Sequence, residues 1–586
     1  MPRPLIWEHQ PHDEARSAAL AAALGVHPVI AHLLCVRGLH EPEAAAHFLK
    51  PKLEDLHDPM RLAGLREAVV RLEEAIARAE PVAIHGDYDV DGITSTVILR
   101  RALELLGGRV AHFIPERMKH GYGLHVDAIE RLAAEGVRVI VSVDCGIRGA
   151  EAARRARELG VDLIITDHHE PDGALPEALA VVNPKRHDCA YPFKDLAGVG
   201  VTLKLVQALC DRAGRSRWLP AFVKIAALGT LADVVPLVGE NRVIARLGLE
   251  WLSRGPHTVG VRSLLEAAGL TGKRLGSFHV GFVLAPRINA AGRMSTAEIA
   301  TRLLLLTDEA MAGEARDLAS QLEVENQKRQ QEEATILAEA RQAIEGDPAI
   351  GAHNVLVVGA EGWHRGVIGI VASKLVETFY KPAIVLSIEG DIAHGSCRSI
   401  PAFNMLGALE QVHDLFIRFG GHRQAAGLTL EAARVPEFRA RINAFADERL
   451  DPADLIPRLR IDAPLSLKAI GKDLLDGLQA MEPFGLCNSR PIFHATPVEL
   501  AEAPRVVKDR HLSMAVRQDG RVFRAIAWRA AERMALLEQH RTNLALAFSL
   551  DRNEYQGETF LQLTVADIRP LEMLNAAPAE QGASVR

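Results

Sequence analysis

Between residues 81 and 182, short apolar runs alternate with stretches of helical pattern, and this alternation constrains the fold more than any other feature. The apolar runs are too short for helices and are bounded by polar residues, which is typical of buried strands. A strand–helix repeat of this kind predicts a parallel sheet with helices on both faces. The expected strands are 82–84, 110–114, 137–143, 163–166 and 181–182, with helices 93–106, 126–134 and 149–159 between them.

Three carboxylates at alternate positions follow the first expected strand: Asp87, Asp89 and Asp91. Acids this close repel one another, and a bound cation relieves that repulsion. Carboxylate oxygens suit hard ions such as Mg²⁺ or Mn²⁺. An EF-hand loop opens with the same spacing, but it requires a preceding helix and a glutamate at its twelfth position, which here is Ile98. A solvated acidic turn without a ligand is the other alternative for this segment.

Further polar side chains follow two other strands of the expected sheet: Asp144, and the triplet Asp167-His168-His169. The carboxyl ends of parallel strands share one edge, and ligands bind at that edge. We therefore expect these side chains to converge with the three acids on one metal site. Asp233 stands in an apolar segment and needs a partner there. By itself it fits a helix cap as well as a metal ligand.

Arginines beside small residues indicate anion binding at several places. A Gly/Ala-rich turn is expected to present Arg287, Asn289 and Arg293 to a phosphate group. A packed loop between domains is the alternative for that turn. Segments 395–399 and 420–427 are expected to be glycine-bearing loops whose free amides receive anions.

Composition bounds the class of protein. The chain has 586 residues, 48% of them apolar and 24% charged, which is typical of a globular protein with more than one core. Its six cysteines form no Cys-x-x-Cys pair, which argues against structural zinc and fits reduced thiols. No stretch reaches membrane-spanning length, so we expect a cytoplasmic protein without membrane contact. The net charge of −7 does not indicate a nucleic-acid partner, so local charge has to decide.

The order of these patterns predicts an α/β multidomain protein. A proline-free stretch rich in Ala, Glu, Gln and Leu predicts one or two long helices that connect domains. Short alternating runs after residue 500 predict an antiparallel unit, a small barrel. The expected parts are a helical segment (1–50), a parallel-sheet domain (51–296), the connecting helix (297–346), a smaller α/β domain (347–450), the barrel (455–570) and a disordered tail (571–586).

The first half of the expected barrel is locally basic. Basic side chains on a small barrel, with exposed rings such as Phe523, Trp528 or Tyr555, suit a single nucleic-acid strand. A solvated basic face packed on its neighbours is the alternative. The basic candidates are Arg505, Lys508, Arg510, Arg517 and Arg521.

The motifs Asp-Tyr-Asp-Val-Asp-Gly, Ser-Val-Asp-Cys-Gly, Asp-His-His and Ala-Asp, in this order, resemble those of the DHH phosphoesterase family. The motifs Arg-Ile-Asn-Ala-Ala-Gly-Arg, Trp-His-Arg-Gly-Val-Ile-Gly, Gly-Ser-Cys-Arg-Ser and Gly-Gly-His narrow the resemblance to its single-strand-specific 5′→3′ DNA exonucleases. The likeness covers residues 50–570 and implies a DHH catalytic domain, a DHH-associated domain and an OB-like barrel.

The resemblance implies an exodeoxyribonuclease of recombination and repair that releases 5′-mononucleotides from single-stranded DNA with a 5′-phosphate. It implies two divalent cations, Mn²⁺ or Mg²⁺, which together activate a water molecule and neutralise charge on the phosphate. It also implies a single-strand binding protein and a helicase as partners. We expect a monomer that works at the nucleoid in the bacterial cytosol.

Roles for individual residues also follow from the resemblance. The implied metal ligands are Asp87, Asp89, Asp91, Asp144, His168 and Asp233. His169 is expected against the scissile phosphate or just behind the metal ligands, and the implied catalytic set is Asp89, Asp144, His168 and His169. Binding of the 5′-phosphate and the strand is implied for Arg117, Arg287, Asn289, Arg293, His364, Ser396, Arg398 and His422. His85 stays unassigned, because two alignments of the first motif are possible.

Two other functions stay open. A DHH phosphoesterase that acts on short oligonucleotides or cyclic dinucleotides would share the metal ligands, but such proteins generally lack the barrel. A non-catalytic DNA-replication scaffold would have lost metal ligands, whereas the acids and histidines are intact here.

Overall fold

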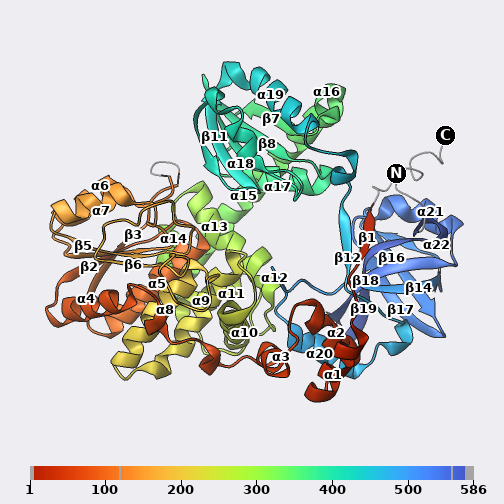
Figure 1. Ribbon diagram of the computed structural model, residues 1–586, viewed down its shortest axis with the longest axis horizontal. Coiled ribbons are helices and arrows are strands. Elements are labelled where there is room, and N and C mark those ends of the chain that lie inside the picture. Colours follow the sequence, from red (N-terminus) through yellow and green to blue (C-terminus); the bar gives the residue numbers. More distant parts are fainter. Residues whose placement is uncertain (1–4, 118–120, 556–557, 575–586) are drawn as a thin grey trace. The chain divides into compact units, whose positions relative to one another are not determined.

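The computed structural model describes residues 5–117, 121–555 and 558–574 (Figure 1). The side chains of residues 553–559 and the tail after residue 574 lie outside the described part. The chain forms two compact units. The larger one consists of residues 51–450 and 485–487, and the smaller one of residues 1–50, 451–484 and 488–586. The N-terminal helical segment therefore belongs to the same unit as the barrel.

A five-stranded parallel sheet in the order β3-β2-β4-β5-β6 opens the larger unit, as predicted. Helices α6 and α7 cover one face, and α4, α5 and α8 cover the other (Figure 1). Both faces are therefore buried, which is why the strands read as unbroken apolar runs. The elements are α4 Leu65–Ala77, β2 Pro81–His85, α5 Val90–Leu105, β3 Arg109–Phe113, α6 Val126–Ala134, β4 Val139–Val143, α7 Ala150–Glu158, β5 Asp162–Thr166, β6 Ala180–Val182 and α8 Gly198–Arg212.

Strands β2 and β4 are neighbours in the sheet although β3 lies between them in the sequence. The strand order therefore reverses between β2 and β4. In open parallel sheets, the crevice at such a reversal is where ligands bind.

A helical layer continues the larger unit. The expected turn around Arg287 is wrong, because these residues form α13, in which Pro286 stands in the first turn and alanines follow. The connecting segment contains one helix of 35 residues, α15. The elements are α9 Leu219–Ala232, α10 Gly239–Arg254, α11 Val259–Ala267, α12 Ser277–His279, a π-helix Val280–Leu284, α13 Ala285–Met294, α14 Glu298–Leu305, α15 Ala312–Gly346 and α16 Pro348–Ala352.

A second, mixed sheet in the order β10-β11-β9-β8-β7 completes the larger unit. The expected glycine-bearing loops 395–399 and 420–427 are largely wrong, because these residues lie mostly in strands β9, β10 and β11. Alternate residues of a strand share a face, so the polar side chains of these segments line one side of the sheet. The elements are β7 Leu356–Glu361, α17 Ile368–Phe379, β8 Ala383–Glu389, β9 Ile392–Arg398, α18 Met405–Glu410, β10 Phe416–Gly421, β11 Ala425–Glu431 and α19 Val435–Asp447.

The smaller unit contains a closed barrel of strands β14, β18, β19, β17 and β16. Most neighbouring strands are antiparallel, but β17 and β19 are parallel, which corrects the expectation of a purely antiparallel unit. The elements of this unit include β1 Ile6–His9, α1 Glu14–Leu24, α2 Pro28–Val36, α3 Pro42–Leu49, β12 Arg458–Ile461, β13 Ala463–Pro464, α20 Lys472–Met481, β14 Phe493–Leu500, β15 Arg505–Val507, β16 His511–Gln518, β17 Arg521–Ala527, α21 Met534–Gln539, β18 Leu544–Tyr555, β19 Glu558–Pro570 and α22 Leu571–Leu574.

The core of the barrel includes apolar side chains from the N-terminal helices, such as Ile30 and Leu33 of α2. These helices are therefore part of the barrel's fold. No single helix in the described part of the chain combines the length and apolarity of a membrane span, and the pair α1 and α2 passes that test only when joined across a 117° bend.

Candidate active site

The side chains expected to bind metal meet at the carboxyl edge of the parallel sheet. The acidic motif 87–91 follows β2, and Asp144 follows the neighbouring strand β4. His168 follows β5, and Asp233 ends α9. Three groups of residues each bring one possible ligand atom per residue to within 4.8 Å of one another: Asp87, Asp89 and Asp144; Asp91, His168 and Asp233; and Asp144, His168 and His169.

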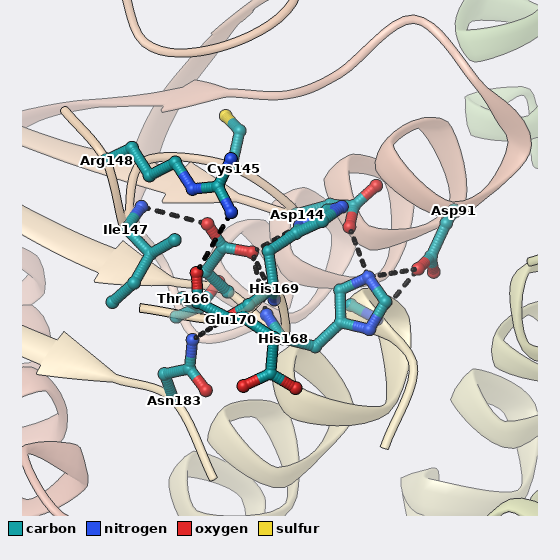
Figure 2. Close-up of polar contacts among 12 residues, drawn as sticks. Asp91, Asp144, Cys145, Ile147, Arg148, Thr166, His168, His169, Glu170 and Asn183 are labelled. Atoms are coloured by element: carbon teal, nitrogen blue, oxygen red, sulfur yellow. Dashed lines mark hydrogen bonds and ion pairs between the residues drawn. The ribbon is translucent and has the colours of Figure 1, made fainter. Parts of the chain in front are cut away.

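His168 lies among the carboxylates, and its ring points between Asp91 and Asp144 (Figure 2). Its Nε2 atom is 3.3 Å from Oδ1 of Asp144, 3.6 Å from Oδ2 of Asp233 and 3.9 Å from Oδ2 of Asp91. Burial lowers the pKa of His168 to about 3, so its imidazole is neutral. A neutral imidazole nitrogen surrounded by carboxylate oxygens is a typical metal-ligand arrangement.

The carboxylates are crowded and shielded from water. Asp87 and Asp144 are 2% and 3% exposed, and burial together with the neighbouring acids raises the pKa of both far above its usual range. The same causes raise the pKa of Asp91 to about 7 and that of Asp233 to about 9.

Several buried ligand atoms lack hydrogen-bond partners within the described residues. They are Oδ1 of Asp87, Oδ1 of Asp144 and Nε2 of His168. Buried polar atoms are nearly always paired in folded proteins, so unpaired acceptors that face one another need a positive partner. These residues therefore fit divalent cations, for which carboxylate and imidazole ligands are suitable.

Asp91 is held by the first turn of α8. Its Oδ2 accepts a hydrogen bond from the amide of Gly198 and its Oδ1 accepts one from the amide of Val199, both at 2.7 Å. The start of a helix favours a negative charge. A side chain at Gly198 would clash, because a Cβ atom there would lie 2.4 Å from Oδ1 of Asp144. The start of α8 therefore fixes Asp91 and leaves room for Asp144.

Asp167 orders the turn after β5. It is fully buried, and its carboxylate accepts hydrogen bonds from the amides of Ile147, His168 and His169 and from Nδ1 of His169. Although burial alone would raise the pKa of Asp167, the bonds from His169 hold it below its usual value. The hydroxyl of Tyr122 lies 3.0 Å from Nδ1 of His169 and 3.2 Å from the carbonyl oxygen of Asp144.

His85 lies at the end of β2 and is fully buried. Its Nδ1 atom is 3.8 Å from Sγ of Cys145, and its ring packs edge-on against Phe113. Burial lowers its pKa to about 4. Among the described residues, His85 is in none of the three groups of possible metal ligands.

A second site in the larger unit is a cavity of about 460 Å³ lined by basic side chains. Arg117 reaches it from the segment after β3, Arg293 reaches it from α13, and Ser396 and Arg398 reach it from β9. Nη1 of Arg293 donates a hydrogen bond of 2.9 Å to the carbonyl oxygen of Gly366. Burial, and then the charge of Arg117, lowers the pKa of Arg293 to about 10, so its guanidinium remains protonated at neutral pH.

Tyr88 connects the cavity with the acidic residues. It stands within the motif 87–91, and the guanidinium of Arg117 lies 5.0 Å from the centre of its ring. Gly292, next to Arg293, approaches the backbone of Tyr88 so closely that a Cβ atom there would lie 2.5 Å from the Tyr88 carbonyl oxygen. The acidic cluster and the arginine-lined cavity are therefore neighbours.

Comparison with known proteins places this geometry in a family. Residues 81–230 match the DHH family N-terminal domain, residues 352–448 the DHHA1 domain, and residues 461–567 the RecJ OB domain. The single-stranded-DNA-specific exonuclease RecJ of Bacillus subtilis is 38% identical over 96% of this chain and 70% of its own length. The chain belongs to the RecJ family.

Solved structures of the RecJ family agree with this assignment. The crystal structure of RecJ from Thermus thermophilus in complex with Mn²⁺ matches 97% of this chain and 80% of its own, at 33% identity and a TM-score of 0.82. The complex of the same protein with Mg²⁺ matches with a TM-score of 0.77 at 32% identity, over 97% of this chain and 78% of its own. The predicted fold class is thereby confirmed.

Two residues of α13 predicted to bind phosphate or DNA lie outside the cavity lining of this RecJ-family chain. Arg287 donates a hydrogen bond of 2.7 Å to Glu323 of α15. Asn289 accepts one of 3.1 Å from the amide of Val90 at the start of α5. Because the segment is a helix, Arg287 and Arg293 point in directions roughly 120° apart, so both cannot face the same cavity.

The predicted residues His364 and His422 also lie outside the cavity lining. Nδ1 of His364 accepts a hydrogen bond of 3.1 Å from the amide of Gly366, which orders the segment before α17. His422 is exposed in the turn between β10 and β11. Both therefore lie beside the cavity-forming segments.

The five basic candidates of the OB domain are all exposed: Arg505, Lys508, Arg510, Arg517 and Arg521. Arg517 forms an ion pair of 3.1 Å with Glu499. The Trp528 side chain is 59% exposed and Phe523 is half-buried, whereas the side chain of Tyr555 lies outside the described part. A basic surface with an exposed indole is suited to a nucleic-acid strand.

Sequence reasoning assigned no role to four residues at these two sites: Tyr122 beside His169, and Arg365, His394 and Arg418 in the cavity lining. Tyr122 stands in the segment Gly-Tyr-Gly, and Arg365 stands in the motif that begins Trp-His-Arg. His394 and Arg418 carry no local signal, because only the pairing of β9, β10 and β11 brings them together.

Proposed function

We propose that this chain degrades single-stranded DNA from a phosphorylated 5′ end and releases 5′-mononucleotides. The observation that carries this proposal is the adjacency of the acidic cluster and the arginine-lined cavity on either side of Tyr88. A terminal phosphate bound by the arginines puts the next phosphodiester of the strand beside the acids. An internal nucleotide offers no terminal phosphate, so the cavity favours exonuclease over endonuclease action.

In this proposal, the ligands of two divalent cations are Asp87, Asp89, Asp144, His168 and Asp233. Asp91 belongs to the same set, and its carboxylate is held in place by the start of α8. Divalent cations in such a site activate a water molecule and neutralise charge on the phosphoryl oxygens. The protein contributes a rigid set of ligands, because Asp91 is fixed by α8 and the turn of His168 is fixed by Asp167.

His169 has a different role in this proposal. Its Nδ1–H is directed at Oδ1 of Asp167, at 2.8 Å, which leaves Nε2 to face outward from that carboxylate. Against the effect of burial, the hydrogen bond to Asp167 raises the pKa of His169, and the protonated ring carries a proton on each nitrogen. We assign Nε2 of this protonated His169 as a hydrogen-bond donor to a non-bridging oxygen of the scissile phosphate. Tyr122 restricts the ring through its hydroxyl.

The 5′-phosphate is assigned to Arg117, Arg293, Ser396 and Arg398, which line the cavity together. Three guanidinium groups and a hydroxyl provide directed donors for a dianion. The strand that follows is assigned to the basic face of the OB domain, which binds it through backbone charge and base stacking.

Family membership supports further parts of this proposal: a role in DNA recombination and repair in the cytoplasm, a monomeric state, and partnership with a single-strand binding protein and a helicase.

Product analysis tests the proposal. A long single strand with a 5′-phosphate or a 5′-hydroxyl is incubated with Mn²⁺, and the products are separated by length. A label at the 3′ end reports the direction of shortening, and a label in the first nucleotide reports the size of the first product. We expect stepwise shortening from the 5′ end, faster for the phosphorylated strand, and mononucleotides as products. Degradation from the 3′ end, or a preference for dinucleotides over long strands, would contradict it. The second outcome would favour a phosphoesterase of short oligonucleotides.

A further inference from the structure

The arginine-lined cavity continues past the residues assigned to the terminal phosphate. Its outer part is lined by Arg365, His394, Arg418 and Thr429. We propose that this outer part is a second anion subsite, which binds a phosphate attached through a pyrophosphate linkage to the 5′-phosphate. The ligand class is a 5′-di- or triphosphorylated nucleotide, at the end of a strand or free.

Strand register separates the two subsites. Ser396 and Arg398 stand on one face of β9, and His394 lies on the same face two residues before Ser396. Two residues of extended strand span roughly 6.6 Å. His394 pairs with Thr429 of β11, which in turn pairs with Arg418 of β10, so these three side chains form one row across the sheet. This row lies one step beyond the row of Ser396.

The row of Ser396 continues across the sheet as glycines, which carry no side chains. Gly427 pairs with Ser396, and Gly420 pairs with Gly427. A Cβ atom at Gly420 would meet no atom within 4 Å, and one at Gly427 would meet only a backbone oxygen at 3.8 Å. The space above the glycines is therefore open, and an anion can lie across it from one row to the next.

The outer row of His394, Thr429 and Arg418, together with the adjacent Arg365, carries more positive charge than the single carboxylate of Glu389 neutralises. The charges of Arg365 and Arg418 both act on His394 and lower its pKa further, after burial as the main cause. Glu389 lies 3.8 Å from Arg365 and 4.0 Å from His394. Among the described residues, no carboxylate forms an ion pair with Arg418. Arg418 therefore presents a guanidinium to the cavity without a protein counter-charge.

A monophosphorylated strand leaves the outer row unused. The function proposed above puts the terminal phosphate at Ser396 and Arg398, and the assignment of the outer row rests on that function. The rest of the strand then runs from this phosphate toward the acidic cluster, so only groups attached on the opposite side of the phosphate reach Arg418. The β- and γ-phosphates of a 5′-triphosphate are such groups, and guanidinium groups bind them with directed hydrogen bonds.

The first cleavage of a triphosphorylated strand follows from this placement. Water adds to the phosphorus between the first and second nucleotides, and the bond from that phosphorus to the 3′ oxygen of the first nucleotide breaks. The first nucleotide leaves as a nucleoside 5′-triphosphate with a 3′-hydroxyl. The shortened strand keeps the phosphate as its new 5′ end.

The test compares strands of one sequence with a 5′-hydroxyl, a 5′-monophosphate or a 5′-triphosphate, using the full chain with Mn²⁺. We expect the triphosphorylated strand to be cleaved with a kcat/KM at least equal to that of the monophosphorylated one, with a nucleoside triphosphate as first product. Substituting Arg418→Gln lowers the tri- to monophosphate ratio of kcat/KM by about fivefold, since one partly exposed charge-assisted contact is lost. Arg423→Gln, an exposed arginine outside the cavity lining, is the matched control and keeps the ratio.

Competition distinguishes the two sources of the ligand. If free nucleotides also use the subsite, a deoxynucleoside triphosphate inhibits cleavage of the monophosphorylated strand more strongly than the monophosphate does, and Arg418→Gln removes the difference. Equal cleavage of both phosphorylated strands by wild type and Arg418→Gln, without preferential inhibition by triphosphates, overturns the second subsite and leaves the proposed function intact. Failure to cleave even the monophosphorylated strand refutes the proposed function itself.

Discussion

The acidic cluster and the arginine-lined cavity are neighbouring sites, and each brings side chains of like charge close together. The charges are negative in the cluster and positive in the cavity. In the acidic cluster, burial and mutual repulsion raise the pKa of Asp91 to about 7 and of Asp233 to about 9. In the cavity, burial and neighbouring arginines lower the pKa of Arg293 to about 10. The carboxylates can therefore take up protons near neutral pH, whereas Arg293 keeps its charge.

This difference indicates how each site binds its ligand. The acids bind a phosphate only indirectly, through cations, and protonation competes with those cations. The arginines bind a phosphate directly and stay charged at any physiological pH. One site is therefore sensitive to metal and pH, and the other is sensitive to the chemistry of the strand end.

The largest expected effect comes from the acidic cluster. Asp144→Asn keeps the shape of the side chain but removes a negative charge next to Asp91 and His168. We expect strand cleavage to fall on the order of a thousandfold, because charge stabilisation at the reacting phosphate is lost. Binding of a 5′-phosphorylated strand, measured by fluorescence anisotropy, should change little. A variant that cleaves at the wild-type rate would exclude the cluster from catalysis.

The next effect distinguishes the cavity from the cluster. Arg398→Ala removes a guanidinium from the cavity lining, and we expect kcat/KM for 5′-phosphorylated strands to fall roughly 10- to 100-fold, the range for a lost charged hydrogen bond. The kcat/KM for 5′-hydroxyl strands should change much less. The kcat for 5′-phosphorylated strands at saturation should also change much less. Equal losses on both ends would remove Arg398 from phosphate binding.

The metal-free protein should lose stability as pH rises. Asp91 and Asp233 have folded pKa values of about 7 and about 9 against an ordinary 3.8, so between these values the folded state binds more protons than the unfolded state. The free energy of unfolding in EDTA therefore falls from about pH 4 through pH 7 and on to pH 9. Mn²⁺ at a hundred times its dissociation constant should add about 2.7 kcal/mol for each ion bound. Thermal unfolding measures both, and at one fixed Mn²⁺ concentration the Mn²⁺-induced shift should be larger at pH 8 than at pH 5, because protonation of the acids competes with the cations.

The OB domain should act on strand length, in contrast to the cavity. Reversing three exposed charges, Arg505→Glu, Lys508→Glu and Arg510→Glu, should weaken the binding of long strands several-fold. The slope of log K against log salt should become shallower by about 2, from 0.7 for each lost contact. The preference for a 5′-phosphate should persist. A loss of that preference would show that the barrel, rather than the cavity, recognises the end.

The smallest effect is expected at Arg287. Because it pairs with Glu323 away from the cavity lining, Arg287→Ala should lower the free energy of unfolding by about 1 kcal/mol and leave the 5′-phosphate preference unchanged. Chemical denaturation and the end-preference assay measure the two quantities. A lost preference would show that Arg287 contacts the strand when DNA is bound.

The sequence predicted the acidic cluster well because its members follow strands of one parallel sheet. For Asp87, Asp144 and His168, strand order alone is enough to bring the side chains to a common edge. Asp233 was open in the sequence, because a carboxylate beside an apolar segment fits either a helix cap or a metal ligand. It stands at the C-terminal end of α9, where the free backbone groups are carbonyl oxygens that a carboxylate cannot cap. Only the approach of α9 to the sheet places it 3.6 Å from His168.

The cavity was less accessible to sequence reasoning. Arg287 and Arg293 look equivalent in the sequence, but their direction depends on whether the segment is a turn or a helix. His394 and Arg418 come together only through the register of three strands, which no local pattern specifies. Likewise, the N-terminal helices share one unit with the segments after residue 450, because apolar side chains of α2 and α20 pack together in the same core.

The most direct test of the acidic cluster is the number of Mn²⁺ ions bound per chain, measured by isothermal titration calorimetry on the wild type and on His168→Ala. Asp167→Asn, which alters the supporting turn and no proposed ligand, is the comparison variant. We predict two ions for the wild type at pH 8, fewer for His168→Ala, and two with weaker affinity for Asp167→Asn. A wild-type chain that binds no Mn²⁺, or a His168→Ala chain that binds it unchanged, would contradict the proposal that these buried acids form a metal centre.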